Sequence, residues 1–237
     1  MKYIRTYKIF ESIDDQFFKT KKEVEDWLNR MGIYSNYLIN DNLIVDVKGN
    51  INLNHKEFEY LPIQFGKIID GHFNINRNCL LTLKGCPYSV STDFSCSYNN
   101  LKSLKYSPVY VGHGFYCRSN KLKSLEGCPK IIKGDFAGDN NELLSLNDIE
   151  FRGNIDILNN PFFDLKDILL NSRVGTVETH EDFLLLLKYL EEYKVIQGNK
   201  IYLSRLKDAL YMIDREDFPI KFLSQYKRIS NYYDVID

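Results

Sequence analysis

The sequence lacks an excess of charge of either sign, because 31 Lys and Arg residues balance 32 Asp and Glu residues and leave a formal net charge of -1. A protein that binds nucleic acid usually carries a basic excess or a basic stripe that contacts phosphates. We therefore expect no nucleic acid among its partners. Hydrophobic residues make up 44% and charged residues 27% of the 237 residues, which is typical of a folded protein with one or two domains.

Long hydrophobic runs are also missing. The longest, Phe183–Leu187, is far too short to span a bilayer, and Met1–Lys8 contains no apolar segment of the secretory type. We therefore expect no membrane association. The absence of a secretory signal favours a reducing, cytoplasmic setting in which cysteines remain free, buried thiols. The cysteines number five: Cys79, Cys86, Cys96, Cys117 and Cys128.

Motifs that carry chemistry are absent too. The sequence has no C-x-x-C pair, no H-E-x-x-H motif and no glycine-rich phosphate loop. Cys96 and Cys117 occupy the position that Ile75 occupies one repeat earlier, which indicates core packing for these thiols. We therefore expect no catalytic residue, no metal and no cofactor, and the four histidines are predicted to be surface or lining residues.

What the sequence does contain is an internal repeat. Four phenylalanines recur every 21 residues, and an asparagine follows each of them after five residues. Leucines follow each asparagine at two fixed offsets, and a proline closes three of the units. The repeated positions are Phe73, Phe94, Phe115 and Phe136; Asn78, Asn99, Asn120 and Asn141; Leu80, Leu101, Leu122 and Leu143; Leu83, Leu104, Leu125 and Leu146; and Pro87, Pro108 and Pro129.

Each repeated position has a physical reason. A phenylalanine and the residue two positions later share one face of a strand, so neighbouring units predict a parallel sheet with one face in the core. The asparagine is expected to turn the chain and to bond the loop backbone of its own and the next repeat. The leucines are expected to fill the core from an opposite, loop-like side, and an aliphatic residue (Val90, Val111 or Ile132) then opens the next strand. Degenerate units at Ile51–Leu61 and Ile155–Leu165 bring the total to about six turns.

The unit Gly-x-Phe-x-Cys-x-x-Asn-x-Leu-x-Ser-Leu-x-Gly-Cys-Pro, with Phe115–Pro129 as its best copy, resembles the short leucine-rich repeats of tailed-bacteriophage proteins. The entry segment Leu43–Leu53 is similar to the lead-in of those proteins. The resemblance implies a leucine-rich-repeat solenoid of α/β class, with a parallel sheet on one face. The N-terminus is similar to phage capsid-targeting peptides, which are cut after a Leu/Ile-x-Glu sequence. That similarity implies processing after Glu11, in Ile9–Glu11.

Three segments follow from these patterns. Residues 1–42 are expected to hold an N-terminal amphipathic segment and a capping helix over residues 13–32, with Trp27 on its apolar stripe. Residues 43–165 form the solenoid. Residues 166–237 show helical periodicity in Phe183–Tyr193, Ile201–Ile213 and Phe218–Ile229, which predicts a helical C-terminal cap or a small bundle.

The outward positions of the strands are the predicted partner-binding face, because solenoids characteristically bind through extended sheet surfaces. The alternative is a solvated surface without a partner. Tyr116 and Arg118 are the expected anchors, since Tyr and Arg are enriched at binding hot spots. The predicted face consists of His72, Asn74, Asn76, Asp93, Ser95, Tyr116, Arg118, Asp135 and Asp139.

Three functional hypotheses remain open. The first is a non-enzymatic, phage-encoded protein-binding module that engages a host protein, for instance of a defence system, or a virion protein, and acts in the host cytoplasm. The second is a packaged internal head or structural protein of the virion. The third is a protein that sequesters a small molecule such as a nucleotide, which ranks last because the strand face offers few basic residues. Ubiquitin-ligase effectors with leucine-rich repeats need a catalytic cysteine in their helical domain, and no cysteine follows Cys128.

Overall fold

The computed structural model describes residues 17–146, 149–162, 180–213 and 227–236. These residues form two compact units. The first comprises residues 17–122, 126–139 and 149–156, and the second comprises residues 123–125, 140–146, 157–162, 180–213 and 227–236. The N-terminal segment that contains Glu11 lies outside the described residues, as does Leu165.

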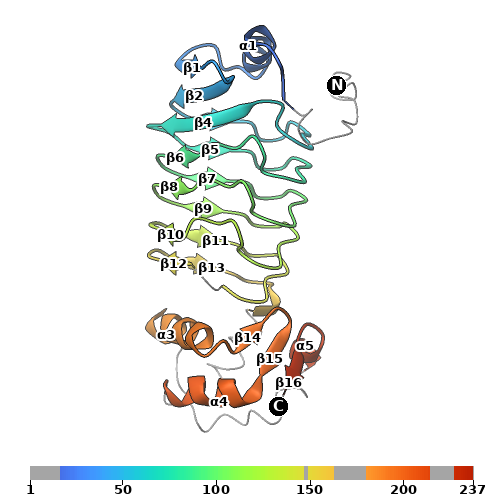
Figure 1. Ribbon diagram of the computed structural model, residues 1–237, viewed down its shortest axis with the longest axis vertical. Helices are drawn as coiled ribbons and strands as arrows, with labels where there is room; N and C mark the ends of the chain where they lie inside the picture. The colour runs from blue at the N-terminus through green and yellow to red at the C-terminus, as the bar shows by residue number, and fades with distance from the viewer. Residues whose placement is uncertain (1–16, 147–148, 163–179, 214–226, 237) are drawn as a thin grey trace. The chain divides into compact units, whose positions relative to one another are not determined.

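The first unit is a parallel β-solenoid (Figure 1). A six-stranded parallel sheet places each core phenylalanine beside that of the next turn, so that Phe73 pairs with Phe94 and Phe94 with Phe115. These pairs confirm the predicted register, and the six strands span five turns of chain, where the sequence analysis expected about six. The strands are β3 (Ile51–Asn52), β5 (Phe73–Asn74), β7 (Phe94–Ser95), β9 (Phe115–Tyr116), β11 (Phe136–Ala137) and β13 (Ile155–Asp156).

A second set of strands lines another side of the solenoid, at the aliphatic residues that the sequence analysis expected to open the phenylalanine strands; that expectation was wrong, because these residues belong to separate strands. The leucine segments, such as residues 80–87, contain no strand, as predicted. The chain crosses the stack through β6, for example, and returns through β7 (Figure 1). Each short strand here has one inward aliphatic residue, such as Val90 or Val111, so no period-two pattern marks it in the sequence. The strands are β1 (Tyr37–Ile39), β2 (Ile44–Lys48), β4 (Gln64–Ile69), β6 (Ser89–Val90) and β8 (Tyr110–Val111) in one sheet, and β10 (Ile131–Ile132) and β12 (Glu150–Phe151) in another.

Between the two sides lies a continuous row of phenylalanine rings. Phe73 and Phe94 stack with their centroids 6.1 Å apart and their planes 1° from parallel. Phe115 and Phe136 stack in the same way at 6.4 Å. All four rings are at most 1% exposed. Because aromatic rings bury a large area each, this row contributes much of the apolar area that the core buries.

The N-terminal end of this row meets a helix. α1 (Lys21–Arg30) places Trp27 5.9 Å from the ring of Phe58 and 6.3 Å from that of Phe65. The predicted helix over residues 13–32 was too long at its start. Thr20 caps the helix in a capping box with Glu23, because its side chain accepts from the Glu23 N–H while the Glu23 carboxylate accepts from the Thr20 N–H. Phe18 lies before the cap and donates its N–H to the carbonyl of Pro62.

The chain leaves each phenylalanine strand through a left-handed residue that directly precedes the asparagine. Arg77, Tyr98 and Ser119 have φ values between 51° and 58°. This conformation is uncommon for residues other than glycine and disfavours their Cβ, so the surrounding contacts must hold it in place. The turn before the phenylalanine strand is closely packed for a different reason: a Cβ on Gly71, between β4 and β5, would clash with the carbonyl oxygen of Gly49.

The asparagine contacts hold this turn. The Asn99 amide donates to the carbonyls of Ile75, Cys96 and Ser97 at 3.0–3.2 Å, and its oxygen accepts from the Leu80 N–H at 3.0 Å. Asn78 and Asn120 donate to the corresponding carbonyls of their own repeats. The prediction of bonds within the same repeat is therefore confirmed, but the second set of bonds reaches the preceding repeat and not the next one.

The second unit combines helices with a small sheet that the sequence analysis did not predict. Ile196 pairs antiparallel with Ile201, which pairs parallel with Val235. Of the third predicted helix only its C-terminal end lies among the described residues. The elements are α3 (His180–Glu192), β14 (Ile196–Gln197), β15 (Lys200–Tyr202), α4 (Leu203–Tyr211), α5 (Lys227–Ser230) and β16 (Asp234–Ile236).

We predict that Asn99→Ala lowers the free energy of unfolding by about 3 kcal/mol or more, because each buried polar group left without a partner costs about 1–3 kcal/mol. Urea denaturation followed by circular dichroism measures this loss. Asn100→Ala is the matched control: its side chain makes no hydrogen bond in the described structure, so a change within about 0.5 kcal/mol is expected. Equal destabilisation by the two variants would contradict the role of the buried amide.

Candidate protein-binding faces

The structure places the predicted binding residues together on the outer face of the six-stranded sheet. Asn74, Ser95 and Tyr116 are register neighbours on β5, β7 and β9. His72, Asp93 and Asp135 come directly before their strands and are half-buried. The residues that the sequence analysis grouped therefore share a face, and their role in binding a partner stays a prediction. We call this set of nine predicted residues the polar face.

Side chains of the polar face bond mainly to the neighbouring turn. Asp93 accepts from the Gly114 N–H at 2.8 Å, and its carboxylate lies 2.8 Å from Nδ1 of His113. Asp135 accepts from the backbone and the side chain of Asn154 at 2.9 and 3.0 Å. These carboxylates satisfy N–H groups of the next turn, which gives them a structural role.

The asparagine and serine members behave in the same way. Asn76 accepts from the Ser97 N–H at 2.6 Å and from the Ser95 hydroxyl at 2.8 Å. The Asn74 side chain accepts from the N–H of Asn76 at 3.0 Å. These side chains bond within the sheet and so have less capacity to bond a partner.

The two expected anchors differ. Arg118 contacts two carboxylates: Asp139 lies 3.1 Å from its Nε, and Asp156 lies 3.4 Å from its terminal nitrogen. Asp139, predicted as an accessible binding residue, is only 8% exposed. Partial burial, followed by the carboxylates of Asp93 and Asp135, raises the pKa of Tyr116 above its ordinary value, so this phenol stays neutral at physiological pH.

The opposite sheets expose apolar side chains instead. Tyr88, Val109, Tyr110 and Ile131 are between 44% and 64% exposed. They come from successive turns: the Val109 N–H donates to the Tyr88 carbonyl, and Tyr110 pairs in register with Ser89. We call these four residues the apolar face. Clustered exposed apolar groups mark an interaction surface more often than single ones do.

The sequence analysis missed the apolar face, although a signal for it was present. Each of its residues lies between a repeat proline (Pro87, Pro108 or Pro129) and the inward aliphatic residue that follows. The apolar character of these positions would have indicated a strand with two apolar sides if the second sheet had been recognised.

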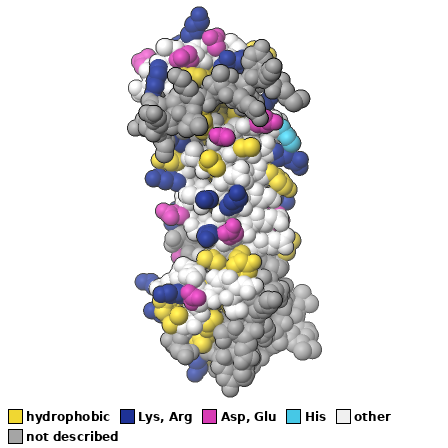
Figure 2. All heavy atoms as spheres, turned by 90° about the vertical axis from the view of Figure 1, so that its right-hand side faces the viewer, with side chains coloured by type: hydrophobic (Ala, Val, Ile, Leu, Met, Phe, Trp, Pro, Cys, Tyr) yellow, Lys and Arg dark blue, Asp and Glu magenta, His cyan; other side chains and the backbone are white. Residues whose placement is uncertain are grey.

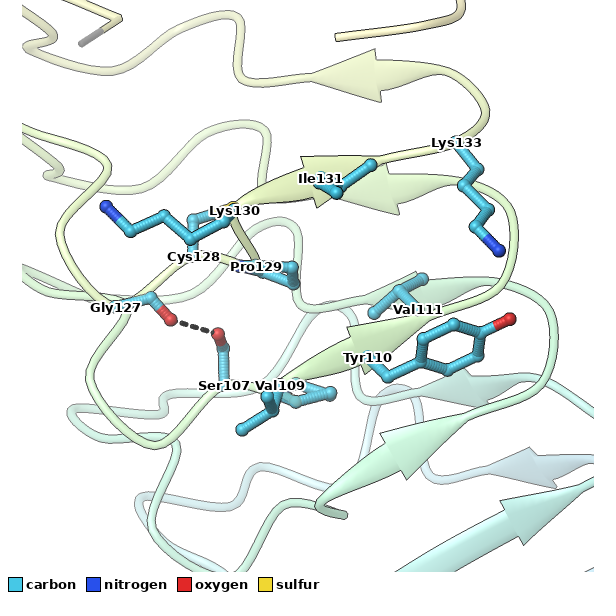
Figure 3. A pocket seen from close by; sticks show the side chains of 11 residues that line it. Ser107, Val109, Tyr110, Val111, Gly127, Cys128, Pro129, Lys130, Ile131 and Lys133 are labelled. Carbon is cyan, nitrogen blue, oxygen red and sulfur yellow. Dashed lines mark hydrogen bonds between the residues drawn. The ribbon is translucent and has the colours of Figure 1, made fainter. Parts of the chain in front are cut away.

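A groove of about 390 Å³ lies within the apolar face (Figure 3). Apolar groups contribute most of its lining, and Lys130 and Lys133 border it. The Lys133 ammonium lies 5.2 Å from the centroid of the Tyr110 ring, close enough for a cation–π contact. The lining residues are Ser107, Pro108, Val109, Tyr110, Val111, Gly127, Cys128, Pro129, Lys130, Ile131 and Lys133.

The edge of the solenoid that carries the asparagine turns has a mixed surface. Figure 2 shows Lys and Arg side chains interspersed with Asp and Glu and with separate apolar groups on this edge. Leu81 and Tyr98 are exposed there, and the Arg77 guanidinium lies 5.1 Å from the Tyr98 ring. This mixture makes the edge a useful reference surface for experiments on the apolar face.

The cysteines serve mainly as core residues. Burial raises the pKa of the Cys86, Cys96, Cys117 and Cys128 thiols, and for the last three neighbouring cysteines add to the effect. The expectation that all the thiols are buried was wrong for Cys79, which is exposed. Within the described ranges, no cluster of three or more His, Cys, Asp or Glu side chains is placed to bind a metal ion. None of the helices described in the structure has the length and hydropathy needed to cross a bilayer.

The chain matches no protein-family model, no curated protein and no solved structure. The contacts of its own residues therefore carry the functional argument.

We predict that one of the five thiols, that of Cys79, reacts rapidly with a thiol reagent in the native protein, because only an accessible thiolate is a good nucleophile. Titration with an aromatic disulfide reagent should give one fast equivalent in native protein and five in denaturant. Cys79→Ser should abolish the fast equivalent. Rapid modification of two or more thiols in the native state would contradict the burial of the other four.

Proposed function

We propose that this chain is a non-enzymatic, phage-encoded protein-binding module with leucine-rich repeats. It engages one host protein, such as a component of a defence system, or one virion protein, and it acts in the host cytoplasm. The 21-residue recurrence of phenylalanine, asparagine and leucine supports the repeat type. The contacts of Trp27 with Phe58 and Phe65 support an N-terminal capping role for α1.

The apolar face is the single observation that carries the protein-binding proposal. Tyr110 and Ile131 lie on strands that pair with a neighbouring turn, and Tyr88 and Val109 directly precede such strands, so a partner immobilises few additional backbone torsions on binding. Tyrosine is enriched at binding hot spots because it combines a large apolar area with a polar tip. Tyr110 therefore replaces Tyr116 as the expected main anchor.

The polar face remains the second candidate surface. A partner that used it would compete with bonds that Asp93, Asn76 and Asp135 already make to adjacent turns. Breaking such bonds costs free energy that the new contacts must replace. The apolar face carries no comparable cost, which is why we place the binding site there.

We predict that Tyr110→Ser/Ile131→Ser weakens partner binding by about tenfold or more, since the loss of one hot-spot contact costs about 1–2 kcal/mol or more. The full chain is immobilised, a partner is captured from host lysate and from disrupted virions, and the identified partner is purified. Its dissociation constant is then measured by biolayer interferometry with wild type and variant.

Leu81→Ser/Tyr98→Ser is the matched control, because it also removes one aliphatic and one tyrosine side chain, but from the turn edge. Serine is accommodated at the backbone conformation of Tyr98, since Ser119 occupies the same place one turn later. A change within about twofold is expected for this control. A loss caused by Tyr116→Ala/Arg118→Ala but not by Tyr110→Ser/Ile131→Ser would assign binding to the polar face.

A further inference from the structure

The two sides of the solenoid differ at one point in the stack. On the phenylalanine side, β9 and β11 pair, with Phe115 beside Phe136. On the other side, the five-stranded sheet ends at β8 and the two-stranded sheet begins at β10, so these strands of the same two turns are not sheet neighbours. The ladder therefore opens locally on one side only, between strands that carry Tyr110 and Ile131.

The groove lies at this opening. Val109 and Tyr110 border it from β8 and the residue before it, and Ile131 borders it from β10 (Figure 3). Pro108 and Pro129 add buried apolar surface to its lining. The groove can therefore accommodate an apolar side chain of a partner. The side chains of the apolar face that surround it are themselves exposed.

The charged residues that line the groove are both lysines, and no Asp or Glu belongs to its lining. Lys133 forms no ion pair with any residue within the described ranges, and its ammonium lies over the Tyr110 ring. The nearest carboxylate in the β10–β12 register is that of Glu150, opposite Ile131, and Arg152 holds it at 2.8 Å.

We infer that the groove binds an acidic peptide segment of the partner protein, with an apolar side chain seated against Val109, Pro129 and Ile131 and a carboxylate at Lys133. This inference rests on the proposed protein-binding function and specifies its partner. The apolar lining excludes water from the seated side chain, and complementary charge selects acidic over basic segments. A phosphate-bearing small molecule would use the lysine but not the proline, valine and isoleucine surface.

The test uses a random dodecapeptide library displayed on filamentous phage and selected against the immobilised full chain. Enriched peptides are synthesised with a fluorophore, and their affinity is measured by fluorescence polarisation. We expect enrichment of sequences that join an aromatic or aliphatic residue to Asp or Glu. Lys133→Glu should weaken their binding by about tenfold or more.

Lys102→Glu is the matched control, because this lysine is also exposed, does not line the groove, and the variant makes the same change in net charge. Its effect should stay within about twofold, and salt should weaken peptide binding to the wild type. Thermal unfolding of both variants checks that neither change disturbs the fold. No enrichment, enrichment of basic or uncharged peptides, equal losses in both variants, or displacement by a mononucleotide would each overturn the inference.

The outcome separates this inference from the proposed function. Capture of a partner that depends on Tyr110 and Ile131 but tolerates Lys133→Glu overturns the acidic-peptide inference and leaves the binding module standing. Binding of acidic peptides at the groove without any host or virion partner overturns the proposed role while the groove chemistry stands.

Discussion

The buried asparagine amide at the end of each phenylalanine strand is the interaction on which the rest of the solenoid depends. Strands of two residues provide few ladder hydrogen bonds, so the turn that follows must satisfy its own backbone groups. Asn99 does this by donating to carbonyls of two turns while accepting from Leu80 of the preceding turn. The bonds span both turns only when equivalent atoms stay in register, and this requirement keeps the repeat at 21 residues through the central turns. The left-handed residue before each asparagine is the conformational cost of that geometry.

Much of the solenoid could be predicted because equivalent positions in successive turns have the same surroundings. The same residue type, phenylalanine, asparagine or leucine, therefore recurs at each of them. The second side could not be predicted, since Val90 and Val111 stand alone as inward residues of their strands and no alternation surrounds them. The start of α1 was predicted wrongly for a different reason. The apolar residues Phe17 and Phe18 extended the predicted helix, although Thr20 and Glu23 carried the capping-box signal that marks its true beginning.

The candidate site was predicted only in part, for a reason that residue type alone does not reveal. Asp93 and Asp135 were correctly placed on one exposed face, but each spends its hydrogen-bonding capacity on the N–H of a residue one turn further along the chain. The sequence analysis took the outward polar residues to be free to bind a partner, because these bonds between turns are not visible in the sequence. The offset of about 21 residues between a carboxylate and its backbone donor becomes visible once the stacking register is known.

In the function that we propose, the polar face contributes to stability and the apolar face to recognition. The polar groups of the polar face already bond adjacent turns, and a partner that broke one of these bonds would leave a buried group unpaired at a cost of about 1–3 kcal/mol. Burying an aliphatic side chain such as Val109 or Ile131 contributes up to about 1.5–3 kcal/mol, and proportionally less for the fraction already covered. In our proposal Tyr88 and Tyr110 add further exposed apolar area, so the apolar face has more apolar surface for a partner to bury than the polar face has. In the same proposal, the groove between β8 and β10 adds selectivity, because its lysines would penalise a basic segment that the apolar groups alone would accept.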